Sequence, residues 1–225
     1  MDEDSSKEIV KNVLKIFFEN YKKIYIFHTI LVILLIFGSI IVLVDNRLVN
    51  FFELSIANPF GIILSIFIQN SLPGLAVNIF SIYLIILAFT VSSALLKFYN
   101  FSLKNDFPKY FILSPVLSSV LANLLTYAIL TVYNLDYVRL SGFHVFIQAL
   151  IGLTFIMILY MFLMLKGYKK IFSPASLTII VAVTLYIVYG VQAFGLGAFM
   201  FDFQKFSSLI FGLLSGFIIV KLKFD

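Results

Sequence analysis

The chain of 225 residues predicts an all-α polytopic membrane protein, and three observations lead to this fold class. Hydrophobic residues make up 62% of the chain and charged residues 12%, with a mean hydropathy of +1.08, whereas a soluble domain is about half apolar and about one quarter charged. Apolar stretches of about 20 residues, the length that crosses the hydrocarbon core as a helix, recur along the chain. Most lysines lie between these stretches, as topology signals do. A soluble globular protein is therefore excluded.

The apolar stretches predict six transmembrane helices in one domain that covers residues 24–221. With short loops, a chain of this length has room for about six or seven spans. Residues 195–205, ahead of the last span, are predicted to form a loop. The predicted spans are 24–44, 73–97, 110–133, 141–165, 174–194 and 206–220.

Residues 1–23 have the pattern of an amphipathic segment on the cytoplasmic surface of the membrane. Apolar residues recur every three or four positions and so share one face of a helix. Lysines lie on or beyond the other face, where they meet anionic lipid headgroups. Membrane lipids are therefore a predicted partner. The apolar residues are Ile9, Val10, Val13, Leu14, Phe17 and Phe18, and the lysines are Lys7, Lys11, Lys15, Lys22 and Lys23.

The lysines also predict the orientation of the chain. In the layout with six spans, thirteen lysines fall on one side of the membrane, and only Arg47, Arg139 and Lys205 fall on the other. Because lysine and arginine are enriched in cytoplasmic loops, we expect a multi-pass protein of the cell membrane with both termini in the cytoplasm. The net charge of +5 and the pI near 9.3 then reflect topology, and no nucleic-acid partner is expected.

Residues 48–72, between the first two predicted spans, carry more polar groups than a lipid-facing helix tolerates. Half-buried helices at the membrane interface suit this composition. The alternative, a conventional span over residues 60–69, is too short to cross the hydrocarbon core. The polar residues are Asn50, Glu53, Asn58, Gln69 and Asn70.

A fixed spacing marks the approach to the second span, in Pro59, Phe67-Ile68-Gln69 and Gly74-Leu75-Ala76-Val77-Asn78. It resembles the rhomboid family of intramembrane serine proteases, which have F-[IL]-H, four residues and H-L-x-x-N at the start of their second transmembrane helix. The asparagine is present, while Gln69 and Gly74 stand in place of the two histidines. The resemblance implies a rhomboid-like six-helix bundle with a membrane-dipping loop between helices 1 and 2.

The start of the fourth predicted span is similar to the segment that carries the nucleophile of this family. Arg139-Leu140-Ser141-Gly142 matches the family sequence G-x-S-G at its last two residues. The resemblance makes Ser141 a candidate nucleophile and Asn78 a candidate donor to the oxyanion. The alternative for Asn78 is a structural hydrogen bond between helices.

The sixth predicted span keeps the frame of the family's histidine motif without the histidine. Ser208, Gly212 and Gly216 occupy the positions of the small residues, and Leu209 occupies the histidine position. A leucine cannot accept a proton, so Ser141 would lack the base of the family. Small residues at this spacing let two helices approach closely, and we expect them to pack the sixth span against the fourth.

Two histidines are present, and each has a functional and a structural interpretation. His144 follows Ser141 by three residues, which places both on one face of a helix and makes His144 a candidate base. A polar residue at the wet end of a helix is the alternative. His28, in the first span, is expected to be a packing or interfacial residue.

These observations favour a rhomboid-like membrane protein without protease activity that engages transmembrane segments of other proteins, here called clients. One alternative is an active intramembrane serine protease that uses Ser141. Another is a small permease or transporter subunit, which would show paired charges inside its spans; the predicted spans contain none. The chain has no cysteine, and no cofactor or metal site is predicted.

Overall fold

The computed structural model describes residues 3–98, 107–166 and 196–224. The regular elements in these ranges are all helices, which confirms the predicted all-α class. Four short elements join the long helices α1 and α4. The long helices are α1 (Glu3–Val44), α4 (Leu72–Phe98), α5 (Phe107–Val132), α6 (His144–Lys166) and α8 (Leu196–Phe224), and the short elements are the 3-10 turns Asn46–Leu48 and Ser65–Phe67 with α2 (Val49–Phe52) and α3 (Gly61–Leu64).

Within the described residues, four helices are long and apolar enough to cross a membrane, which indicates a membrane protein. They contain the stretches Tyr21–Val44, Leu72–Thr90, Pro108–Val132 and Phe199–Lys221. The described apolar part of α6, His144–Tyr160, is shorter than these. The predicted span 174–194 lies outside the described residues.

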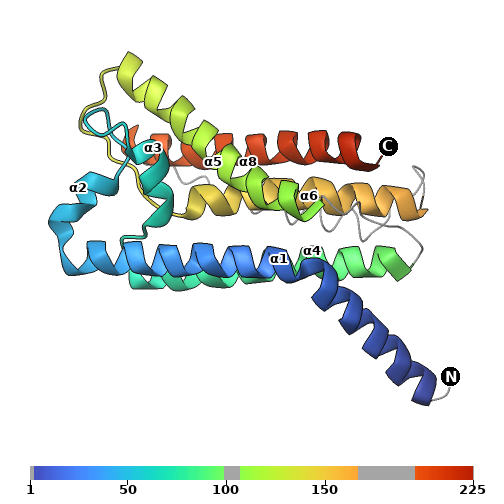
Figure 1. The fold of residues 1–225 in the computed structure, drawn as a ribbon. Coiled ribbons are helices and arrows are strands. Elements are labelled where there is room, and N and C mark those ends of the chain that lie inside the picture. Colours follow the sequence, from blue (N-terminus) through green and yellow to red (C-terminus); the bar gives the residue numbers. More distant parts are fainter. Residues whose placement is uncertain (1–2, 99–106, 167–195, 225) are drawn as a thin grey trace.

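The long helices form a bundle with its short elements gathered at one end (Figure 1). Helix α1 lies beside α4, and α6 lies beside α8. Helices α2 and α3, the chain before α6 and the start of α8 meet at one end, here called the loop end. Both termini lie toward the opposite end, here called the terminal end.

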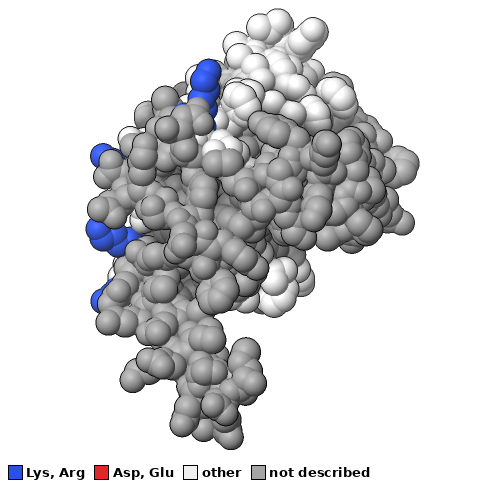
Figure 2. Space-filling view, turned by 90° about the vertical axis from the view of Figure 1, so that its right-hand side faces the viewer, with Lys and Arg blue, Asp and Glu red and all other residues white. Residues whose placement is uncertain are grey.

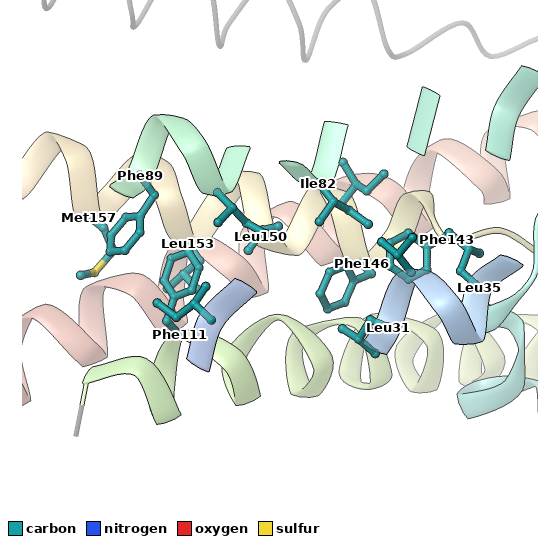
Figure 3. Close-up of a cluster of buried hydrophobic side chains, with 14 of the residues drawn as sticks. Leu31, Leu35, Ile82, Phe89, Phe111, Phe143, Phe146, Leu150, Leu153 and Met157 are labelled. Carbon is teal, nitrogen blue, oxygen red and sulfur yellow. The ribbon is translucent and has the colours of Figure 1, made fainter. Parts of the chain in front are cut away.

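Aromatic and aliphatic side chains fill the space between α1, α4, α5 and α6 (Figure 3). The rings of Phe89 and Phe111 stack with centroids 4.3 Å apart. His28 belongs to this core: its Nδ1 lies 2.8 Å from the Ile24 carbonyl oxygen, and its ring contacts Phe111 and Phe146. The packing interpretation of His28 is therefore confirmed.

Helices α6 and α8 make close backbone contact along a stripe of small residues, here called the α6–α8 seam. A Cβ atom at Gly212 would meet the backbone of Ala149, and one at Gly152 would meet the backbone of Leu209 and Leu213. Ser208 Oγ donates a hydrogen bond to the Val145 carbonyl at 2.6 Å. In lipid, where apolar burial gives little drive for helix association, such close packing holds helices together. The predicted packing between these two segments is confirmed.

The predicted start of the last helix is wrong. Helix α8 begins at Leu196, so residues 196–205 are helical and not a loop. The helical start places Asp202 and Lys205 one turn apart, with Lys205 Nζ 3.5 Å from Asp202 Oδ1. This ion pair lies within the apolar stretch Phe199–Lys221, just ahead of the predicted span 206–220, which contains no charged residue.

The predicted division between an N-terminal segment and the first span is not visible as a break in the helix. Helix α1 runs without interruption from Glu3 to Val44, and its first part extends away from the bundle (Figure 1). The helix ends at Val44, where the predicted span ends. Asp45 then accepts hydrogen bonds from the backbone and side chain of Arg47.

Candidate functional site

The loop end is built by joining the α1–α4 connection to the chain ahead of α6. Leu54 and Leu140 exchange two backbone hydrogen bonds, of 2.8 and 3.0 Å, in an antiparallel bridge. The Gly142 amide donates a further bond of 3.2 Å to the Ser65 carbonyl. Because Glu53 precedes Leu54 and Ser141 follows Leu140, the bridge brings these two side chains together.

The fold of the connection itself depends on Asn58 and Gly61. The Asn58 side-chain amide lies within 3.3 Å of the carbonyls of Asn50, Phe51 and Glu53. It therefore satisfies carbonyls that the single turn of α2 leaves without partners. A side chain at Gly61 would collide with the backbone of Glu53 and Leu54, so a glycine there lets α3 pack directly on this segment.

Ser141, Glu53 and Asn70 form a compact polar group, here called the Ser141 cluster. Asn70 Nδ2 donates to Ser141 Oγ at 2.7 Å and to Glu53 Oε1 at 3.2 Å. Ser141 Oγ lies 3.5 Å from Glu53 Oε1, at the outer limit of a hydrogen bond. The cluster opens to the outside, because Asn70 is exposed and Ser141 is half-buried.

Burial dominates the electrostatics of Glu53. Only 9% of this residue is exposed. This burial raises the pKa of Glu53, against the opposing effects of the Asn70 hydrogen bond, the Arg139 charge and the Ser141 hydroxyl. Arg139 also donates a hydrogen bond to the Asn50 side chain, which joins the chain ahead of α6 to the α1–α4 connection.

His144 turns away from Ser141 toward α8. Helix α6 begins at His144, so Ser141 precedes the helix, and the assumption that both residues share one helical face does not hold. Its ring packs on Phe201 with centroids 4.2 Å apart. The ring nitrogen Nε2 is buried, so the interpretation of His144 as a wet residue is wrong. The structure has no hydrogen bond between Ser141 and His144. The role of His144 as a base therefore stays a prediction.

Gly142 makes this turn possible. Its φ angle of 132° lies in the region that favours glycine. A side chain there would also collide with Nδ1 of His144. The glycine after the serine therefore sets the path of the chain into α6.

Asn78 is buried in the first turns of α4 and bonds to the preceding loop. Its Nδ2 donates to Gln69 Oε1 at 2.9 Å. The backbone amide of Gln69 donates to Ser39 Oγ at 3.0 Å. Asn78 thus connects α4 through Gln69 to α1, which is the kind of structural bond that its alternative interpretation predicts. Leu209, at the family's histidine position, is buried in the α6–α8 seam.

A second polar network, here called the Asn123 chain, crosses the bundle below the Ser141 cluster. Asn123 Nδ2 donates to the Ile62 carbonyl at 2.8 Å and to Ser65 Oγ at 3.1 Å. Gln204 Nε2 in turn donates to Asn123 Oδ1 at 2.7 Å. These bonds tie the α3 region, α5 and α8 together, which agrees with the structural role expected of an intramembrane asparagine.

Sequence reasoning did not single out Glu53 or Asn70 as site residues. Their only signal was the high density of polar residues between positions 48 and 72. Nothing in the sequence indicates that Glu53 meets Ser141, since the contact depends on a bridge between segments far apart in the chain.

Comparison with protein-family models, with curated proteins and with solved structures finds no match to this chain. Within the described ranges, no group of three or more His, Cys, Asp or Glu side chains is placed to hold a metal ion. The fold and the loop end together define the chain as a helical membrane protein with a polar cluster beside the start of α6.

Proposed function

We propose that this chain is a rhomboid-like membrane protein that engages transmembrane segments of clients and does not use a Ser–His protease mechanism. The proposal rests on a contrast between two groups of positions that resemble the rhomboid motifs, those that pack helices and those that would carry the chemistry. The small residues Gly212 and Gly216 pack α8 on α6, whereas Leu209 fills the histidine position and Ser141 bonds to Asn70.

The distribution of charge supports six spans with both termini in the cytoplasm. Viewed toward the terminal end, Figure 2 displays lysine or arginine and no acidic residue among the described side chains. Lys22 and Lys23 are exposed partway along α1, Lys109 is exposed in the first turn of α5, and Lys221 is exposed in the last turn of α8. The carboxylates Asp45, Glu53, Asp136 and Asp202 belong to the loop end. Arg47, Arg139 and Lys205 also belong to the loop end, so the proposed orientation rests on the thirteen lysines that the six-span layout places on the other side.

The α1–α4 connection supports a loop that dips into the membrane. Phe51, Phe60 and Ile63 are exposed on it, next to the polar residues that fold it. Apolar side chains at the surface of such a loop can enter the bilayer interface while the backbone stays bonded within the protein. In this proposal the loop disturbs the lipid beside α4.

Helix α4 offers the surface for a client. Its apolar stretch is 28% buried, compared with 39% to 44% for the other three candidate spans. Val77, Phe80, Leu84 and Leu87 are exposed along it. A client helix beside α4 would cover these side chains and replace lipid contacts with protein contacts.

Site-specific photocrosslinking tests the proposal. A photoreactive residue is placed at Phe80 or Phe60 in the full-length protein in native membranes, and at Leu214, an exposed position on α8, as the matched control. We expect a defined membrane protein at Phe80 and Phe60 but not at Leu214, and reconstitution with that purified protein should restore the crosslink. Crosslinks to lipid alone at all three positions would refute client binding.

A transporter subunit is the second candidate, because one observation favours it. Asp202 and Lys205 form an ion pair in the first turns of α8, and Asp202 Oδ2 is buried without a partner. Buried charges in a membrane helix often mark an ion or substrate path. Solute uptake by proteoliposomes that Asp202→Asn abolishes would favour this function over client binding.

A further inference from the structure

The Ser141 cluster contains reactive groups that client binding does not require. A hydroxyl, a carboxylate and an amide donor lie within 3.5 Å of one another and come from two segments that the Leu54–Leu140 bridge holds together. A serine becomes a nucleophile when a neighbouring group can take its proton. In this structure the group in that place is Glu53.

We propose that Glu53 is the proton acceptor for Ser141, and that the pair hydrolyses a carboxylic ester at the loop end through an acyl-Ser141 intermediate. This inference goes beyond the proposed function, because a client can bind without any covalent step. It also needs no histidine.

The proton and the acyl group balance over two steps. In the first, Ser141 Oγ bonds to the ester carbonyl carbon, its proton passes to Glu53, and the ester C–O bond breaks as the leaving alkoxide takes that proton from Glu53. In the second, water attacks the acyl carbon, gives one proton to Glu53, and the Ser141 oxygen leaves and recovers that proton. The products are a carboxylic acid and an alcohol, with Glu53 and Ser141 restored.

The surroundings suit the two partners. The raised pKa of Glu53, which follows from its burial, makes its carboxylate a stronger base than an exposed one. Asn70 Nδ2 donates to Ser141 Oγ at 2.7 Å and to Glu53 Oε1 at 3.2 Å, so it holds the hydroxyl beside the carboxylate. An ester is favoured over an amide because an alkoxide leaves more readily than an amide nitrogen.

The site is also open to a substrate. Asn70, Ser71, Leu72 and Pro73 are exposed beside the half-buried Ser141. An apolar acyl chain can lie on the exposed start of α4 while its carbonyl reaches the cluster.

The test uses the purified full-length protein in proteoliposomes with two probes, a fluorophosphonate that labels reactive serines and p-nitrophenyl butyrate. The variants are Ser141→Ala and Glu53→Gln, which keeps an oxygen acceptor for Asn70. The matched control is Arg47→Gln, an exposed residue at the same end. Thermal melts establish that each variant is folded.

We expect the fluorophosphonate to label Ser141, the label and ester hydrolysis to disappear in Ser141→Ala, and both to slow by about 100-fold in Glu53→Gln, with Arg47→Gln unchanged. A folded wild-type protein that is not labelled, or a Glu53→Gln protein that reacts like the wild type, would overturn the inference. Crosslinking from Phe80 does not depend on Ser141, so the two proposals fail independently.

Discussion

The α6–α8 seam and the Ser141 cluster are built on opposite principles. In the seam, Gly152 and Gly212 bring two backbones into contact, so the fit depends mainly on the shape of the two helices. In the cluster, side chains of three separate positions meet through hydrogen bonds of 2.7 to 3.5 Å. The seam depends on small residues of two neighbouring helices, whereas the cluster depends on polar side chains from segments far apart in the chain.

The seam should be the most sensitive part of the molecule. Gly212→Leu places a side chain against the Ala149 backbone, which cannot move without shifting α6. We expect a loss of about 3 kcal/mol or more in the free energy of unfolding, or no folded protein. Thermal denaturation in detergent measures it. The control Ala76→Leu adds similar bulk at an exposed position of α4, and equal losses in both variants would refute the importance of the seam.

Gly142 should be the most sensitive backbone position at the loop end. Gly142→Ala forces a side chain into a φ of 132° and against His144, at a cost of about 2 kcal/mol. The contrasting variant is Gly74→Ala, where the new Cβ meets the end of the flexible Gln69 side chain. Thermal melts should rank Gly142→Ala well below Gly74→Ala, and the reverse order would contradict the described path into α6.

The Asn123 chain should contribute less than either glycine. Asn123→Leu removes donors to Ile62 and Ser65 and an acceptor for Gln204. We expect a loss of about 1 kcal/mol, since hydrogen bonds between membrane helices are individually weak. The matched control is Leu124→Ala, at an exposed neighbouring position. An unchanged melting temperature in Asn123→Leu would show that the chain does not hold α5 to α8.

The smallest expected effect is the change of melting temperature with pH that Glu53 causes. Because its pKa is raised in the folded protein, the folded state holds the proton more tightly than the unfolded state does. The resulting contribution to the free energy of unfolding is fully present below the ordinary pKa of 4.5, and it is lost as the pH rises through the raised pKa. The melting temperature of the wild type should therefore fall over this range relative to that of Glu53→Gln. Parallel curves for the two proteins would contradict the burial of this carboxyl.

Much of the helical framework could be predicted from the sequence, because it depends on local composition. The helix over Leu72–Phe98 and the end of α1 at Val44 follow apolar runs that charged or polar residues terminate. The start of α8 could not be predicted in this way. Asp202 and Lys205 lower the local hydropathy, and in the structure they pair across one turn of the helix.

Only single residues of the candidate site could be predicted from the sequence, and not how they are arranged. Ser141 and Asn78 stood out through their resemblance to a spacing, and the structure places them in different hydrogen-bond groups. The partners of Ser141 could not be found, because Glu53 and Asn70 reach it through the long-range bridge between Leu54 and Leu140. His144 does not share a helical face with Ser141, because Gly142 turns the chain before the helix begins.

The most direct test of this account is the cleavage of a general rhomboid substrate segment by the purified protein in proteoliposomes. The assay compares the wild type with Ser141→Ala and His144→Ala, each shown to be folded. Because His144 packs on Phe201 and Leu209 fills the histidine position, the account predicts no cleavage by any of the three proteins. Cleavage by the wild type that both substitutions abolish would establish a Ser–His protease and contradict it.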